Sequence, residues 1–121
     1  MDKNKTAIVF AGQGAQFTGM GKELYETSAA ARKVFDAAEV LRKGTIKQCF
    51  EGTKEELSLT INTQPCIFTV SMAYAQSLNE QGIIPQAVAG FSVGELAAVT
   101  YAGILSFEDG FKAGRDLKEH K

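Results

Sequence analysis

The sequence predicts an α/β fold with parallel strands, and three observations support this prediction. Two short runs rich in apolar and β-branched residues, TAIVF at 6–10 and QAVAG at 86–90, are typical of buried strands that lead into a glycine-containing turn. Segments with helical periodicity lie between and after them. Strands alternating with helices favour parallel pairing through right-handed crossovers. Because only two clear strands are present, the chain of 121 residues is expected to form one incomplete sheet domain.

The first predicted helix covers residues 28–42, where apolar side chains recur every three or four positions, and it ends near Gly44. Thr53 and Glu56 have the spacing of a capping box, which predicts a short connecting helix. Ser106 and Asp109 give a similar signal for a last helix that runs into the polar end of the chain.

A long helix is predicted before the second strand. Asn62 or Thr63 is the expected cap, Pro65 suits the first turn, and Gly82 is the expected end. Apolar residues cover a wide face of this segment, so we expect it to be largely buried.

Composition excludes several classes of function. The 13 basic and 14 acidic side chains are interspersed and give a net charge of -1, which argues against binding to nucleic acid. No apolar run approaches the roughly 20 residues that span a bilayer, and the start does not resemble a signal peptide, so we expect a cytoplasmic protein that does not bind membranes. Cys49 and Cys66 lack the spacing of a metal or redox motif and are interpreted as ordinary core thiols, so no metal is expected.

The chemistry is indicated by Gly90-Phe91-Ser92-Val93-Gly94, a GxSxG motif between a predicted strand and a predicted helix. In that context the motif is a nucleophile elbow, whose sharp turn exposes the serine. The N–H groups at the start of the following helix would stabilise negative charge on an acyl oxygen. Ser92 is therefore the predicted nucleophile, and the Val93 N–H a predicted oxyanion donor.

A second glycine-containing loop, FAGQGAQ at 10–16, follows the first strand. Its small residues allow close approach of the backbone, so it could supply another oxyanion N–H. The glycine spacing through Gly19 is not that of a dinucleotide-binding loop, and nucleotide binding is disfavoured.

Three blocks in this order resemble the malonyl-CoA:acyl carrier protein transacylases: FAGQGAQFTGMGKELYE, NTQP and AVAGFSVGELAAVTYAGILSFEDG. The resemblance implies a hydrolase-like α/β subdomain with a nucleophile elbow, of which residues 1–121 are the N-terminal part, the small ferredoxin-like subdomain being absent. It implies transfer of a malonyl group from malonyl-CoA to acyl carrier protein through acyl-Ser92, in fatty acid or polyketide synthesis. It places Gln13 and Val93 in the oxyanion hole and Gln64 near the site. Beyond the thioester substrates, no cofactor is implied.

The chain departs from the family pattern at three places. Phe91 stands where the family has histidine, and Leu117 where it has the arginine that pairs with the malonyl carboxylate. Arg115 is the nearest arginine and the substrate-binding candidate, although an offset of two residues turns a helix by about 200°. The family's general-base histidine lies beyond residue 121, and His120 is a poor substitute.

Two other readings therefore stay open. The same elbow serves serine hydrolases and thioesterases, which release a free acid. A truncated, non-catalytic paralogue could instead bind a carrier protein or associate with itself through an exposed sheet edge.

Overall fold

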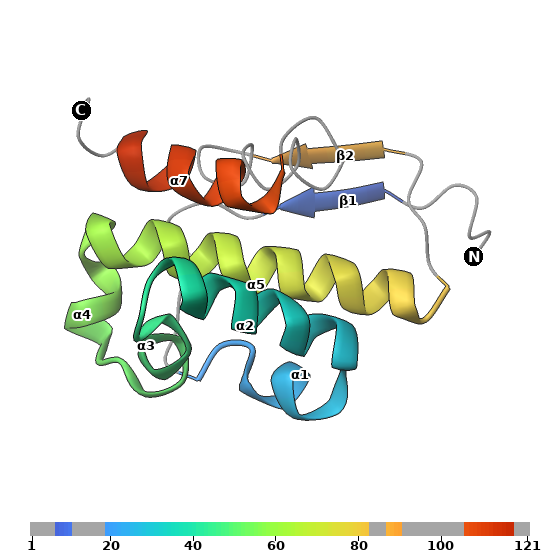
Figure 1. Cartoon of the computed structure of the whole chain (residues 1–121), viewed down its shortest axis with the longest axis horizontal. Coiled ribbons are helices and arrows are strands. Elements are labelled where there is room, and N and C mark those ends of the chain that lie inside the picture. The colour runs from blue at the N-terminus through green and yellow to red at the C-terminus, as the bar shows by residue number, and fades with distance from the viewer. Residues whose placement is uncertain (1–6, 11–18, 83–86, 91–105, 118–121) are drawn as a thin grey trace.

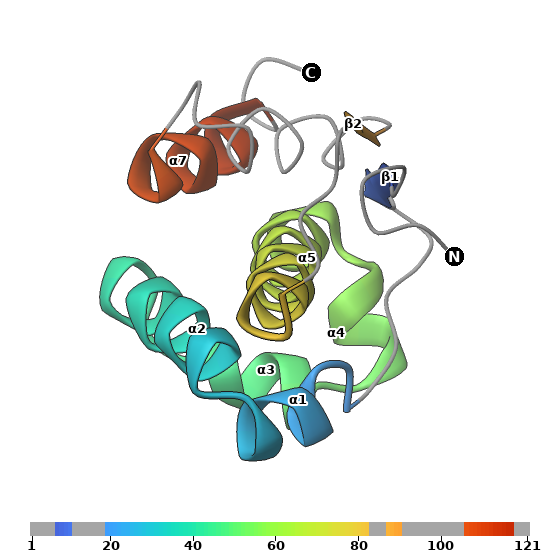
Figure 2. The same cartoon turned by 90° about the vertical axis from the view of Figure 1, so that its right-hand side faces the viewer.

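The computed structural model describes residues 7–10, 19–82, 87–90 and 106–117, with the side chains of 19–82 and 106–112. The elements run in the order β1 (Ala7–Phe10), α1 (Lys22–Thr27), α2 (Ala29–Leu41), α3 (Thr45–Glu51), α4 (Lys54–Ser58), α5 (Thr60–Glu80), β2 (Ala87–Gly90) and α7 (Phe107–Leu117). Figure 1 shows the two strands and α7 on one side of α5 and helices α1 to α4 on the other. Figure 2 gives the same arrangement from a perpendicular direction, so α5 is the central element.

The two strands pair in parallel. Ala7 lies opposite Ala87, and the register continues to Phe10 opposite Gly90. The strands predicted at 6–10 and 86–90 are thus present over Ala7–Phe10 and Ala87–Gly90, and Thr6 and Gln86 lie outside the described residues. Because the last residues pair with each other, both strands end at the same edge.

The predicted fold class is nevertheless wrong for the residues that the structure describes. These residues are mostly helical, and sheet is limited to one pair of four-residue strands. A pair of strands this short has too little surface to organise a core. The buried clusters are formed instead by side chains of the helices and of one turn, so helix packing holds this part of the chain together.

Helix α5 contributes to both hydrophobic clusters, as its predicted burial requires. One face carries Phe68, Met72 and Ala75 into a cluster with α2 and α7, and another carries Cys66, Val70 and Ala73 into a cluster with α1 to α4. A helix buried on more than one side is expected to be apolar around most of its circumference. Within the described residues, no helix is long and apolar enough to cross a membrane.

Several helix starts carry side-chain caps, which satisfy backbone N–H groups that have no partner inside the helix. The caps at Thr53 and Ser106 confirm two predictions, and Ser28 supplies a third cap. The acceptor oxygens and donor N–H groups are Ser28 Oγ with Ala31 N at 3.1 Å, Thr53 Oγ1 with Glu56 N at 3.1 Å, and Ser106 Oγ with Asp109 N at 3.0 Å.

The predicted start of the long helix is wrong. Helix α5 begins at Thr60, and Pro65 lies inside it instead of in its first turn. Asn62 does not cap the helix, because its Nδ2 donates to the Glu56 carbonyl of α4 at 2.9 Å. The chain re-enters a helix directly after α4, so side chains in the first turn of α5 satisfy carbonyls at the end of α4.

Two short helices, α1 and α3, were not predicted. Each follows a glycine in the left-handed region, Gly21 with φ of 81° and Gly44 with φ of 92°. Such a conformation costs a residue with a Cβ about 1–2 kcal/mol, which explains glycine at these turns. Gly44 does mark the end of the α2 segment, as predicted, but it also opens α3.

Glu39 near the end of α2 holds the turn into α3. Its carboxylate accepts hydrogen bonds from the N–H groups of Gly44 at 2.6 Å and Ile46 at 3.0 Å. These bonds hold the pKa of Glu39 below its ordinary value of 4.5. A group with a lowered folded pKa stabilises the fold above its unfolded pKa, and that stabilisation is lost as the pH falls through the folded pKa.

We therefore expect Glu39→Gln to lower the free energy of unfolding at pH 7. The difference from the unsubstituted chain should shrink when urea unfolding is repeated below pH 4.5. Glu26→Gln is the control, because no hydrogen bond to the Glu26 carboxylate is seen within the described part of the chain. A deficit for Glu39→Gln that stays constant with pH would contradict the assignment.

Candidate functional site

The predicted nucleophile and oxyanion donors, Ser92, Val93 and Gln13, lie outside the described residues. The strands that lead to them are described. Because Phe10 pairs with Gly90, the chain leaves toward Gln13 and toward Ser92 from paired residues at one edge of the sheet. Ligand sites in open parallel sheets lie beyond the carboxyl ends of the strands.

The same end of the molecule holds the beginning of α5. In Figure 1 the arrowheads of β1 and β2 point toward the end where α5 begins and α4 lies, so α5 runs opposite to the strands. The amino-terminal turns of α5 include Gln64, the glutamine predicted to lie near the site. The fold therefore brings this turn of the helix to the end toward which both strands run.

Gln64 is buried, with 3% of its surface exposed. Its Oε1 is shielded from solvent and accepts no hydrogen bond from the residues that the structure describes. A buried acceptor without a partner costs about 1–3 kcal/mol, so such groups often serve a function. Gln64 thus offers an unused acceptor at the beginning of α5.

The neighbouring Thr63 provides a direct comparison. Its Oγ1 donates to the Leu59 carbonyl at 2.9 Å and also contacts the Leu57 carbonyl, and the side chain is fully buried. We expect Thr63→Val to lower the free energy of unfolding by about 1–3 kcal/mol, because it removes the hydroxyl donor from the buried Leu57 carbonyl. Gln64→Met should lower it by less than about 1 kcal/mol, because it removes the unpartnered acceptor.

Chemical denaturation of both variants checks this prediction. If Gln64→Met lowered the free energy of unfolding as much as Thr63→Val or more, the Gln64 side chain would stabilise the fold. It would then not be an acceptor left available for a ligand.

Arg115 lies in α7, and its side chain is outside those described. Leu117 is the last residue of that helix, and Phe91 and His120 lie outside the described residues. The arginine predicted to bind substrate therefore stays a prediction.

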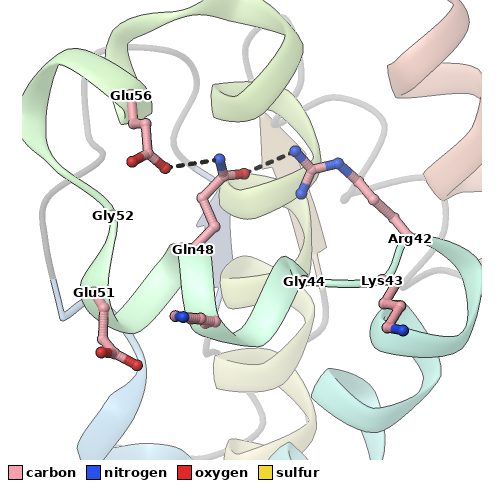
Figure 3. Close-up of a pocket in the computed structure, with 8 residues that line it drawn as sticks. Arg42, Lys43, Gly44, Gln48, Glu51, Gly52 and Glu56 are labelled. Atoms are coloured by element: carbon pink, nitrogen blue, oxygen red, sulfur yellow. Dashed lines mark hydrogen bonds between the residues drawn. The ribbon is translucent and has the colours of Figure 1, made fainter.

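A pocket of about 310 Å³ lies between the α2–α3 turn, α3 and α4, and sequence reasoning missed it. Figure 3 shows Gln48 between Arg42 and Glu56: Arg42 Nη2 donates to Gln48 Oε1 at 2.7 Å, and Gln48 Nε2 donates to Glu56 Oε2 at 3.1 Å. Arg42 also donates to Thr45 Oγ1 at 3.1 Å and to Asn62 Oδ1 at 2.9 Å. All of its partners are neutral side chains.

Metal-binding side chains do not cluster in the part of the chain that the structure describes. No group of three or more histidine, cysteine, aspartate and glutamate residues there could hold an ion.

Comparison with known proteins identifies the family. The family model described as "Acyl transferase domain" matches residues 7–114. A malonyl CoA-acyl carrier protein transacylase of Bacillus subtilis (strain 168) is 50% identical over 107 residues, which are 88% of this chain and 34% of that protein. This chain thus spans about a third of the length of this relative.

Solved structures agree. The malonyl CoA-acyl carrier protein transacylase of Clostridium perfringens superposes with a TM-score of 0.89 at 34% identity, over 95% of this chain and 37% of that one. A malonyl-transacylase solved in complex with a type II PKS acyl-carrier protein gives a TM-score of 0.84 at 32% identity, over 93% and 37% of the two chains. The resemblance found in the sequence is confirmed, and the chain belongs to the acyl transferase domain family.

Proposed function

We propose that this chain provides the nucleophile of an acyltransferase that moves a malonyl group from malonyl-CoA to an acyl carrier protein. The observation that supports it most is the register of β1 and β2. Phe10 and Gly90 end their strands opposite each other. In sequence, the GQGAQ loop and the GxSxG elbow therefore come directly after the same edge of the sheet. An elbow at the carboxyl end of a strand is the context in which GxSxG carries a nucleophile.

The relatives supply the substrate class. The Bacillus and Clostridium relatives are malonyl CoA-acyl carrier protein transacylases, and another relative was solved with an acyl-carrier protein bound. The thioester of malonyl-CoA and the thiol of the carrier protein are accordingly the proposed acyl donor and acceptor.

The proposed reaction has two steps. Ser92 Oγ attacks the thioester carbonyl, its proton passes to a base, and the C–S bond breaks to release coenzyme A. The carrier thiol then attacks the acyl-serine, the C–O bond breaks, and Ser92 regains a proton. The backbone N–H groups of Gln13 and Val93 would hold the oxyanion in both steps. Gln64, whose buried Oε1 has no partner among the described residues, would accept a hydrogen bond near this site.

A chimera tests this proposal. This chain replaces the segment that it matches in the Bacillus subtilis relative, so that residues beyond 121, including the family's base histidine, are present. We expect the chimera to gain one malonyl group by intact mass and to pass it to acyl carrier protein. A folded chimera that gains none would overturn the proposal, and release of free malonate in place of transfer would indicate a hydrolase.

The 121-residue chain alone serves as the comparison. If the chain alone also gains a malonyl group, it activates Ser92 without those residues. If only the chimera does, the base must come from the added segment.

A further inference from the structure

Cys49 and Cys66 lie 17 positions apart in sequence but meet in the structure. Both side chains have 0% exposed surface, one on α3 and the other on α5, and neither forms a disulfide. The Cys49 thiol points at the Cys66 backbone, with its Sγ 4.0 Å from the Cys66 carbonyl oxygen. The two thiols are also within hydrogen-bonding reach of each other. The two cysteines are therefore neighbours in the buried cluster to which α3 and α5 contribute.

The two sulfurs differ in their surroundings. Cys66 Sγ lies 3.6 Å from Gln48 Oε1, and the Arg42 guanidinium both holds Gln48 and reaches the Cys66 sulfur. The hydrogen bond from Cys49 and the positive charge of Arg42 lower the pKa of the Cys66 thiol. The pKa of the Cys49 thiol is raised by the same hydrogen bond and by burial. Cys66 is therefore the more nucleophilic sulfur, because the thiolate is the reactive form.

Arg42 forms no ion pair within the described part of the chain. Among the described residues the ion pair seen joins Lys112 to Glu108, and the guanidinium of Arg42 is held by neutral oxygens. The Glu39 carboxylate interacts with Arg42 through space without a hydrogen bond to the guanidinium, and Glu56 partly opposes the lowering of the Cys66 pKa. The guanidinium can still stabilise an anion next to it. A thiolate at Cys66 is the anion within its reach.

The pocket in Figure 3 gives a route to this sulfur. Arg42 and Gln48 line it (Figure 3), and Gln48 Oε1 accepts a hydrogen bond from the Cys66 thiol at 3.6 Å. Cys66 itself does not line the pocket. Oxidation of Cys66 by a small polar oxidant in this pocket would therefore require movement of the Gln48 side chain.

We propose that Cys66 and Cys49 form a peroxide-sensitive pair, in which Cys66 is oxidised first and Cys49 resolves it to a disulfide between α3 and α5. The Cys66 thiolate attacks hydrogen peroxide, so that an S–O bond forms, the O–O bond breaks and hydroxide leaves. The Cys49 sulfur then attacks the sulfenic acid, an S–S bond forms, the S–O bond breaks, and the Cys49 proton leaves with the hydroxyl as water. In sum, two thiols and one peroxide give one disulfide and two waters.

The test uses the 121-residue chain and does not depend on acyl transfer. One equivalent of hydrogen peroxide should reduce the intact mass by two hydrogens and remove both thiols from a titration in denaturant, and dithiothreitol should restore them. Cys49→Ser should stop at the sulfenic acid, which dimedone traps on Cys66 alone. Cys66→Ser should take up no dimedone. Circular dichroism confirms that each variant is folded.

Arg42 and Lys47 give a matched pair of variants, because both line the pocket and carry a positive charge. We expect Arg42→Gln to slow oxidation of Cys66 by at least about tenfold, since it raises the thiol pKa by removing the adjacent charge. Lys47→Gln should change the rate by less than about twofold, and Arg42→Lys should restore part of it.

Four results would overturn the proposal. They are unchanged thiols in the folded chain after peroxide, a disulfide that forms only in denaturant, a disulfide between two chains, and oxidation of Cys66→Ser at the rate of the unsubstituted chain.

Discussion

Replacing Ser92 by alanine in the chimera is expected to abolish the malonyl-enzyme and to reduce transfer to the carrier protein by about 10⁵- to 10⁶-fold. The proposed mechanism passes the acyl group through Ser92 Oγ, and an alanine cannot form the ester. Losses of this size are typical when a serine nucleophile that acts with a base is removed. Intact mass after exposure to malonyl-CoA reports the first step, and transfer to acyl carrier protein reports both.

Ser58→Ala is the matched control for this substitution. Ser58 is exposed on α4, and its Oγ donates to the Lys54 carbonyl at 2.7 Å. Its removal should leave both steps unchanged. A Ser92→Ala chimera that still gains one malonyl group would place the nucleophile elsewhere and refute the role given to the elbow.

The elements with strong local signals were predictable. The two strands, the α2 segment and the caps at Thr53 and Ser106 were all found, because each rests on residues close together in sequence. Helices α1 and α3 were missed, because helices of six or seven residues are too short to show a helical period. The fold class was wrong because the alternation of strands and helices was given more weight than the large share of helical residues between the two short strands.

The predicted start of α5 was wrong for a different reason. Asn62 and Thr63 are good capping residues by type, but here they bond to carbonyls of the preceding helix. Local propensity cannot distinguish a cap from a side chain that joins two helices, since the same residue types can accept from a backbone N–H or donate to a backbone carbonyl. Only the packing of α4 against α5 decides between them.

The predictions about candidate functional residues also differ according to whether they depend on local sequence or on packing. The GxSxG motif pointed to Ser92 from sequence spacing, and the family comparison supports that reading. The burial of Cys49 and Cys66 was predicted from residue type and is confirmed. The contact between the two cysteines could not be predicted, because it depends on how α3 packs against α5. The same holds for the effect of the Arg42 guanidinium on Cys66.

Phe35→Ala is expected to cost about 3–5 kcal/mol of unfolding free energy. The Phe35 side chain is fully buried at the centre of the cluster formed with α1, α3 and α5. Its ring lies 5.3 Å from that of Phe50 and 5.7 Å from that of Tyr25, between centroids. It also packs against Gly21, where an added Cβ would lie 2.6 Å from Phe35 Cζ. Neighbours on so many sides leave little room for the core to collapse into the cavity.

The loss should be a large fraction of the stability of a small domain, which is typically about 5–15 kcal/mol. Val40→Ala on the same helix is the control, because Val40 is 86% exposed and its truncation should change stability by less than about 0.5 kcal/mol. Urea unfolding followed by circular dichroism compares the two. Equal, small losses would mean that α2 does not pack on α5 as described, since the exposed and the buried position of one helix would then be equivalent.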